Sequence, residues 1–163
     1  MTVRRLLEEY PMRNVAVLEH RYASWMRDYE VEVEAAWSEE QQGRYLYRFR
    51  HCPVAHVVSR LGDDVWRQSW PDVYTDHGAW VEAGEPEGFV WGMRWSFAKP
   101  GLSHVETSEQ AKAWSQRLGK TMHEVKIETD VYQLRLIFHS LIVRKVSDEL
   151  LILDPATLSA LQA

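Results

Sequence analysis

The chain has 163 residues, of which 45% are hydrophobic and 26% charged, and its formal net charge is −5 with a pI near 5.8. This composition is typical of one globular domain rather than a disordered segment. The acidic balance argues against a protein whose whole surface binds phosphate. Cys52 is the only cysteine, so an intrachain disulfide is excluded and an oxidising compartment is not implied. We find no apolar run of signal-peptide or membrane-span length, and we expect a single domain over residues 1–163 in the cytoplasm.

Hydrophobic periodicity predicts a long amphipathic helix over residues 12–37. Apolar and aromatic side chains recur there at spacings of three and four, which places them on one helical face: Val15, Leu18, Tyr22, Trp25 and Tyr29. The alternation over residues 31–34 is the one strand-like feature of this stretch. Residues 1–40 would then form a helical N-terminal segment that packs on its own core or on another chain, and residues 44–163 would form an α+β core.

The middle of the chain predicts a strand, a helix and a loop. Residues 44–49 alternate with three aromatic side chains on one face, which favours a strand. Pro53 at a first helical position and Gly62 just past an apolar stripe predict a helix over residues 53–61. Residues 63–88 are rich in glycine and proline and indicate a loop, with a short strand at residues 79–82.

Regular structure is predicted again from Phe89 onward. Residues 89–97 alternate as a strand with one apolar face. Thr107 and Gln110 have the spacing of a capping box, and they predict a helix that ends at Gly119. Three or four strands follow, at about residues 121–128, 131–138, 140–146 and 149–153, before a short terminal helix that begins at residue 154. The element order favours the α+β class: a mostly antiparallel sheet with packed helices and a long N-terminal amphipathic helix.

Eight tryptophans, several of them beside arginines, indicate either an aromatic core or a binding surface. Exposed Trp and Arg are enriched where proteins bind one another, and the same residues bind single-stranded nucleic acid by stacking and phosphate contacts. The candidate residues for such a surface are Arg44, Arg50, Trp66, Arg67, Trp70 and Trp80.

Metal and thiol chemistry find little support in the sequence. His51, Cys52 and His56 lie within six residues of one another, but zinc prefers four ligands and no second Cys/His pair lies nearby. A helix N-terminus would lower the pKa of Cys52, yet no histidine stands out as its base. We therefore predict no metal.

The order of several segments is similar to the ADP-ribosyltransferase fold over residues 44–155. The segments that carry the resemblance are Tyr47-Arg48, Arg94-Trp95-Ser96-Phe97, the helix of residues 106–114, His123–Ile127 and Asp148–Pro155. The resemblance implies NAD as a cosubstrate, with Arg48 on its pyrophosphate and Trp91 or Trp95 on its nicotinamide. It also implies Ser96 beside the nicotinamide and Glu149 as the glutamate that acts in the transfer.

Two functions follow from these observations. The first is an NAD-consuming, ADP-ribosyltransferase-like enzyme that modifies a protein or a nucleic acid, which requires Arg48, Ser96 and Glu149 to meet in one cleft. The second is a non-catalytic module that binds a protein or single-stranded nucleic acid through exposed Trp and Arg. The positions of these residues in the fold discriminate between the two.

Overall fold

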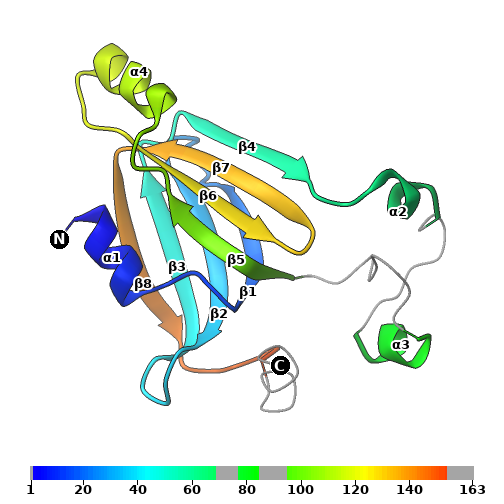
Figure 1. Cartoon of the computed structure of the whole chain (residues 1–163). Helices are drawn as coiled ribbons and strands as arrows, with labels where there is room; N and C mark the ends of the chain where they lie inside the picture. The colour runs from blue at the N-terminus through cyan, green and yellow to red at the C-terminus, as the bar shows by residue number, and fades with distance from the viewer. Residues whose placement is uncertain (1, 69–76, 85–94, 154–163) are drawn as a thin grey trace.

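The computed structural model describes residues 2–68, 77–84 and 95–153, and its main feature is one antiparallel sheet (Figure 1). The strands lie in the order β4-β7-β6-β5-β1-β2-β3-β8. Their bounds are β1 Val15–Tyr22, β2 Tyr29–Ala36, β3 Gln42–Arg50, β4 Val54–Ser59, β5 Ser96–His104, β6 His123–Thr129, β7 Tyr132–Phe138 and β8 Ser140–Ser147. The helices are α1 Val3–Glu9, α2 Asp63–Gln68, α3 His77–Glu82 and α4 Glu109–Leu118. None of these helices is long and apolar enough to cross a lipid bilayer.

The sheet curls round on itself, because β7 and β8 are joined by His139 alone although they lie near opposite ends of the strand order. The chain can make that connection only if the two ends of the sheet approach each other. Across the gap, Phe49 of β3 packs edge-on against Phe138 of β7 with ring centroids 4.8 Å apart. The backbone amide of His139 also donates to the carbonyl of Arg50 at 2.9 Å.

The core fills the inside of this curl. Alternate residues of each strand point inward, and those of β3 are Tyr45, Tyr47 and Phe49, all buried. Helix α1 adds Val3 and Leu6 to the same cluster. Helix α4 packs elsewhere, on the outer face of the sheet, where Ala111 and Met122 contact Ile137.

A buried carboxylate fastens the segment after β8 to the outer face of β2. Glu34 is fully buried, and its two oxygens accept hydrogen bonds from the backbone amides of Leu151, Ile152 and Leu153 at 2.6–2.8 Å. Because unpaired buried charges are costly, these amides are what make burial of Glu34 possible.

The predicted α+β class with a long N-terminal helix is wrong, because the described chain is predominantly β. Residues 12–37 form the β1–β2 hairpin, and the helical part of residues 1–40 is limited to α1. The physical cause is a bulge between Val17 and Glu19, which shifts the inward-facing positions of β1 by one residue. The inward-facing positions of β1 are therefore Val15, Val17, His20 and Tyr22, so the strict alternation that indicates a strand is lost.

Three smaller elements also differ from prediction. Residues 53–61 contain β4 instead of a helix, in keeping with the β-branched side chains of Val54, Val57 and Val58. Residues 79–82 belong to α3 rather than to a strand, and no strand forms at residues 149–153. Residues 89–94 of the strand predicted at residues 89–97, and the terminal helix predicted from residue 154, lie outside the described residues.

Residues 63–68 of the predicted loop form α2, and β5 continues to His104, beyond the predicted strand end at residue 97. The remaining elements are confirmed. The strand predicted at residues 44–49 is β3, and those predicted at residues 121–146 are β6, β7 and β8. The helix α4 begins after Ser108, whose side chain accepts from the amide of Ala111, so Ser108 rather than Thr107 is its N-cap. It ends at Gly119 in the left-handed conformation, with φ of 63°.

Candidate binding surface

The turn between β1 and β2 displays two large apolar side chains. Trp25 is 50% exposed and Met26 is 69% exposed. The turn is closed by two backbone hydrogen bonds of 2.8 Å, one from Met26 to the carbonyl of Ala23 and one from Ala23 to the carbonyl of Asp28. These bonds fix the backbone that carries both side chains.

Two residues at this end of the molecule adopt a backbone conformation that favours glycine. Met26 has φ of 56° and His51, which follows β3, has φ of 48°. For residues with a Cβ atom this left-handed conformation costs about 1–2 kcal/mol each. Such strain persists only where the surrounding structure enforces it, and it is concentrated at functional sites.

The carboxylate of Asp28 binds the backbone of His51, whereas the amide of Met26 is held by the carbonyl of Ala23. Asp28 is 1% exposed, and its Oδ1 accepts from the backbone amide of His51 at 3.0 Å and from Nε of Arg27 at 2.9 Å. Its Oδ2 accepts from Nη2 of Arg27 at 3.2 Å, and the amide of Cys52 donates to the carbonyl of Arg27 at 2.8 Å. We refer to residues 23–28 together with residues 51–52 as the Asp28 clasp.

The clasp holds Asp28 in its ionised form. Burial by itself raises the pKa of the Asp28 carboxyl, but the hydrogen bonds from Arg27 and His51 outweigh burial, and the pKa is lower than that of an ordinary aspartate.

Positive charge surrounds the clasp, although the chain as a whole is acidic. The pKa of His51 is lowered first by burial and then by the nearby charges of Lys120, Arg27 and Arg50. The Arg48 guanidinium lies 5.3 Å from the centroid of the Trp25 ring. Cationic side chains therefore border Trp25 and Met26, which form the exposed apolar tip of the turn.

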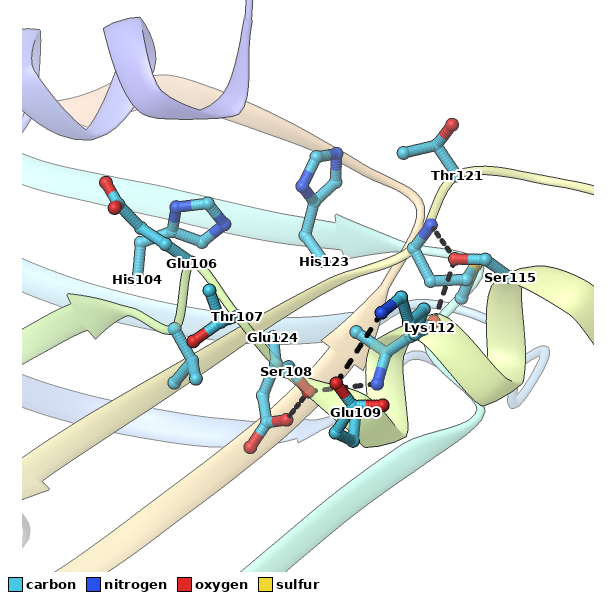
Figure 2. Close-up of a pocket in the computed structure, with 13 residues that line it drawn as sticks. His104, Glu106, Thr107, Ser108, Glu109, Lys112, Ser115, Thr121, His123 and Glu124 are labelled. Atoms are coloured by element: carbon cyan, nitrogen blue, oxygen red, sulfur yellow. Dashed lines mark hydrogen bonds and ion pairs between the residues drawn. The ribbon is translucent and has the colours of Figure 1, made fainter.

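A pocket of about 530 Å³ lies elsewhere, between the start of α4 and the ends of β5 and β6 (Figure 2). Ser108, Glu109 and Lys112 come from the start of α4, whereas His104 and His123 come from the sheet and place their ring centroids 5.7 Å apart. Burial is the main cause of a lowered pKa at His123.

Several polar groups of this pocket already have hydrogen-bond or ion-pair partners. Ser108 donates to Glu124, which also pairs with Arg135. Ser115 donates to the carbonyl of Ala111 at 2.8 Å and accepts from the amide of Met122 at 2.9 Å. These bonds attach α4 to the sheet. Within the described ranges, no three His, Cys, Asp or Glu side chains gather so that they could hold a metal ion.

The comparisons with known proteins identify a family. A family model described as YxiG-like protein matches residues 1–155. The chain belongs to the YxiG-like family. No curated protein matches it in sequence. A crystal structure titled as an uncharacterized protein from Neisseria gonorrhoeae is similar at 7% identity and a TM-score of 0.41, over 82% of this chain and 93% of that one.

The residues predicted for NAD chemistry do not meet in the YxiG-like chain. Ser96 is buried and faces the core opposite Val17, and its Oγ donates to the hydroxyl of Tyr132 at 3.2 Å. Arg48 lies on the outer face opposite Glu30, with Nη2 of Arg48 2.6 Å from Oε1 of Glu30. Strands β1 and β2 separate them, which corresponds to about 14 Å across the sheet, and the register places Arg48 three residues, or about 10 Å, along β3 from the position opposite Ser96.

The remaining residues of that prediction are also dispersed. Glu149 is exposed beyond the end of β8, and its backbone amide donates to Oγ of Ser147 at 3.1 Å. Ser147 pairs with Arg44, four residues along β3 from Arg48. Trp95 is half-buried before β5, and Trp91 lies outside the described residues.

The residues predicted for a binding surface are placed as follows. Arg44 pairs with Glu32 at 3.4 Å, and its Nε is buried without a hydrogen-bond partner. Arg50 is half-buried at the end of β3 beside the clasp. Trp66 is exposed in α2, where Arg67 lies 3.9 Å from Asp63. Trp80 belongs to α3, and Trp70 lies outside the described residues.

Sequence reasoning missed the Asp28 clasp because it placed Trp25 on the buried face of a helix. The signal that could have found it is the pair of alternating stretches at residues 15–22 and 29–36, which predict a hairpin whose turn contains Trp25 and Met26.

Proposed function

We propose that this chain is a non-catalytic protein-binding module, and that Trp25 and Met26 insert into an apolar pocket of the partner. The observation that carries the proposal is the exposure of both side chains on a turn whose backbone is strained and fixed. Large exposed apolar side chains rimmed by polar groups mark protein-binding sites, and tryptophan is enriched among the residues that dominate binding energy.

The rigidity of the Asp28 clasp supports this role. A turn that is already ordered loses little conformational entropy when it binds, so more of the contact energy contributes to affinity. The hydrogen bonds of Asp28 to Arg27 and to the amide of His51 hold the tip in one conformation before any partner arrives.

The charge around the tip indicates the kind of partner. Arg50 and Lys120 act on His51 as nearby positive charges, so the rim carries cationic side chains in addition to Arg27 and Arg48, which are paired with Asp28 and Glu30. A partner with an acidic rim around its apolar pocket would be attracted at long range and oriented on approach.

A protein fits this surface better than single-stranded nucleic acid does. The Arg48 guanidinium lies over one face of the Trp25 ring, which reduces the area on which a base could stack. Arg27 and Arg48 are each paired with a carboxylate, of Asp28 and Glu30 respectively, which reduces the charge available to phosphates. The proposal includes a cytoplasmic location, since the single cysteine needs no oxidising compartment.

Site-specific cross-linking in the cells that make the protein tests the proposal. A photoreactive amino acid replaces Met26 in one variant and Val146, an exposed valine of β8, in a control variant. We expect a protein adduct that forms from position 26 and not from position 146. The absence of any adduct specific to position 26 would contradict the proposal.

Affinity measurements with the purified adduct partner complete the test. Trp25→Ala should weaken binding tenfold or more, which corresponds to a loss of about 1.4 kcal/mol or greater. Trp66→Ala, which removes a similarly exposed tryptophan from α2, is the matched control and should leave the affinity unchanged. Titrations with single-stranded oligonucleotides and with NAD run alongside. Binding of an oligonucleotide that depends on Trp25 would favour the nucleic-acid module instead, and NAD turnover that Glu149→Gln abolishes would favour the transferase.

A further inference from the structure

The two edge strands of the sheet differ in how they are protected. β8 carries Arg144 and Lys145, and α1 contacts it. β4 runs Val-Ala-His-Val-Val-Ser, without lysine, arginine, aspartate, glutamate or proline. It pairs with β7 over its whole length without a bulge. Charges, prolines and bulges are the usual devices that stop an edge strand from pairing with another chain, and β4 has none of them.

The outer edge of β4 offers free backbone groups. Within residues 2–68, 77–84 and 95–153, no strand pairs with that edge (Figure 1). The amide of Arg60 donates to the carbonyl of Val131 on the β7 side at 2.9 Å. Hydrogen-bonding direction alternates along an antiparallel strand, so Val54, His56 and Val58 also bond toward β7. The backbone groups of Ala55, Val57 and Ser59 therefore point outward.

The side chains of β4 are equally uncovered. Val57 pairs with Leu134, a core residue, so it continues the inner face of the sheet, yet it is 46% exposed. Val58 lies on the outer face and is 48% exposed. The inner face of the sheet therefore continues onto β4, but the core does not cover the side chain of Val57 there.

We infer that β4 pairs antiparallel with β4 of a second copy of this chain, about a two-fold axis at Val57. In this register, the residues whose backbone groups point away from β7 pair with one another. Val57 pairs with Val57, and Ala55 of each copy pairs with Ser59 of the other. His56 then lies opposite Val58. No aspartate, glutamate, lysine or arginine lies on the strand, so the pairing places no permanent like charges opposite each other.

The symmetry of this pairing limits its size. Both copies use the same edge, which makes the contact isologous and closes it at two subunits. The other edge, β8, carries the charges that disfavour further strand addition. The expected assembly is a dimer with a continuous sheet, and it involves a surface distinct from the Asp28 clasp.

Sedimentation of the full chain over a range of concentrations tests the dimer. We expect a concentration-dependent dimer for the wild type and a monomer for Val57→Lys, because two lysines would meet at the two-fold axis. Val146→Lys adds the same charge to an exposed valine of β8 and should remain dimeric. Circular dichroism verifies that both variants are folded. A wild type that stays monomeric at every concentration, or a Val57→Lys variant that is folded and still dimeric, would overturn the inference.

Cysteine cross-linking tests the register and does not depend on the folding of the lysine variant. Cys52 is buried, so a cysteine introduced by Val57→Cys is the accessible thiol. At the two-fold axis the two Cα atoms would lie about 5.5 Å apart, within the range that a disulfide spans. We expect Val57→Cys to form a covalent dimer on mild oxidation much faster than Val146→Cys. Equal rates for the two variants would overturn the proposed register.

Discussion

Oδ1 of Asp28 lies 3.0 Å from the backbone nitrogen of His51, and this hydrogen bond joins the β1–β2 turn to the turn after β3. The same oxygen accepts from Nε of Arg27 at 2.9 Å. One buried carboxylate oxygen therefore holds two segments that are 23 residues apart in the chain. The exposed tip at Trp25 and Met26 depends on this junction for its shape.

We expect Asp28→Asn to lower the free energy of unfolding by about 1–3 kcal/mol, because a charge-assisted acceptor becomes a neutral amide that cannot satisfy both donors. Urea unfolding at neutral pH measures the change. The pKa of Asp28 is lower in the folded chain than in the unfolded one, so its contribution is full above the ordinary aspartate value near 3.8 and decreases as the pH falls below it. The difference between wild type and Asp28→Asn should therefore shrink in strong acid. A difference that stays constant would show that the charge of Asp28 is not involved.

Met26→Gly should raise stability while weakening partner binding. Glycine adopts φ of 56° without strain, and relief of that strain should outweigh the entropy cost of glycine by about 0.5–1 kcal/mol. The same substitution removes the most exposed apolar side chain of the tip. Thermal melting and the affinity for the cross-linked partner check the two effects separately. Unchanged affinity would remove Met26 from the binding surface.

Acidification from pH 7.5 to pH 5.5 should destabilise the fold through its histidines. Burial is the main cause of a lowered pKa at His20, His51 and His123. A histidine with a lowered pKa stays neutral in the folded chain while the unfolded chain takes up protons, so stability decreases as the pH falls below about 6.5. His123→Gln should lose less stability over this range than the wild type does. Thermal melting of the wild type and of His123→Gln at both pH values measures the two losses of stability.

Cys52 should not react with thiol reagents in the folded protein. The predicted helix start at this position would have lowered the pKa of the thiol, but Cys52 instead precedes β4, and burial raises its pKa to about 12. Its Sγ donates to the carbonyl of Val54 at 3.2 Å. A disulfide reagent at pH 8 should label the wild type only when denaturant unfolds it, whereas the exposed thiol of Val146→Cys should react at once. Rapid labelling of the native wild type would mean that the segment around Cys52 opens readily.

The elements that sequence reasoning predicted correctly are those whose pattern is uninterrupted. β3 alternates Tyr45, Tyr47 and Phe49 without a break, and α4 has both a capping serine and a terminal glycine. β1 was missed because its bulge breaks the alternation, and β4 because an edge strand leaves Val57 and Val58 exposed. In both cases the deciding interaction is with another strand, and local sequence does not contain it.

The candidate site was less predictable for a similar reason. The importance of exposed Trp and Arg for binding was a reasonable hypothesis, but the residues named for it did not include Trp25 or Met26. What sets the tip apart is the contact of Asp28 with His51, which forms only when the hairpin and the turn after β3 meet. The same lack of long-range information allowed Arg48 and Ser96 to be assigned to one cleft, although the fold places them on opposite faces of the sheet.

The attachment of Glu34 to residues 151–153 has a consequence for biosynthesis. Glu34 is made early, but the amides that satisfy its carboxylate are translated 117–119 residues later. β3 likewise pairs with β8, which is translated later. While the chain is still emerging from the ribosome, the outer face of β2 and one edge of β3 therefore lack their partners. Nascent chains stalled before residue 151 should be cleaved by protease within β2 and β3, and release of the following residues should confer resistance.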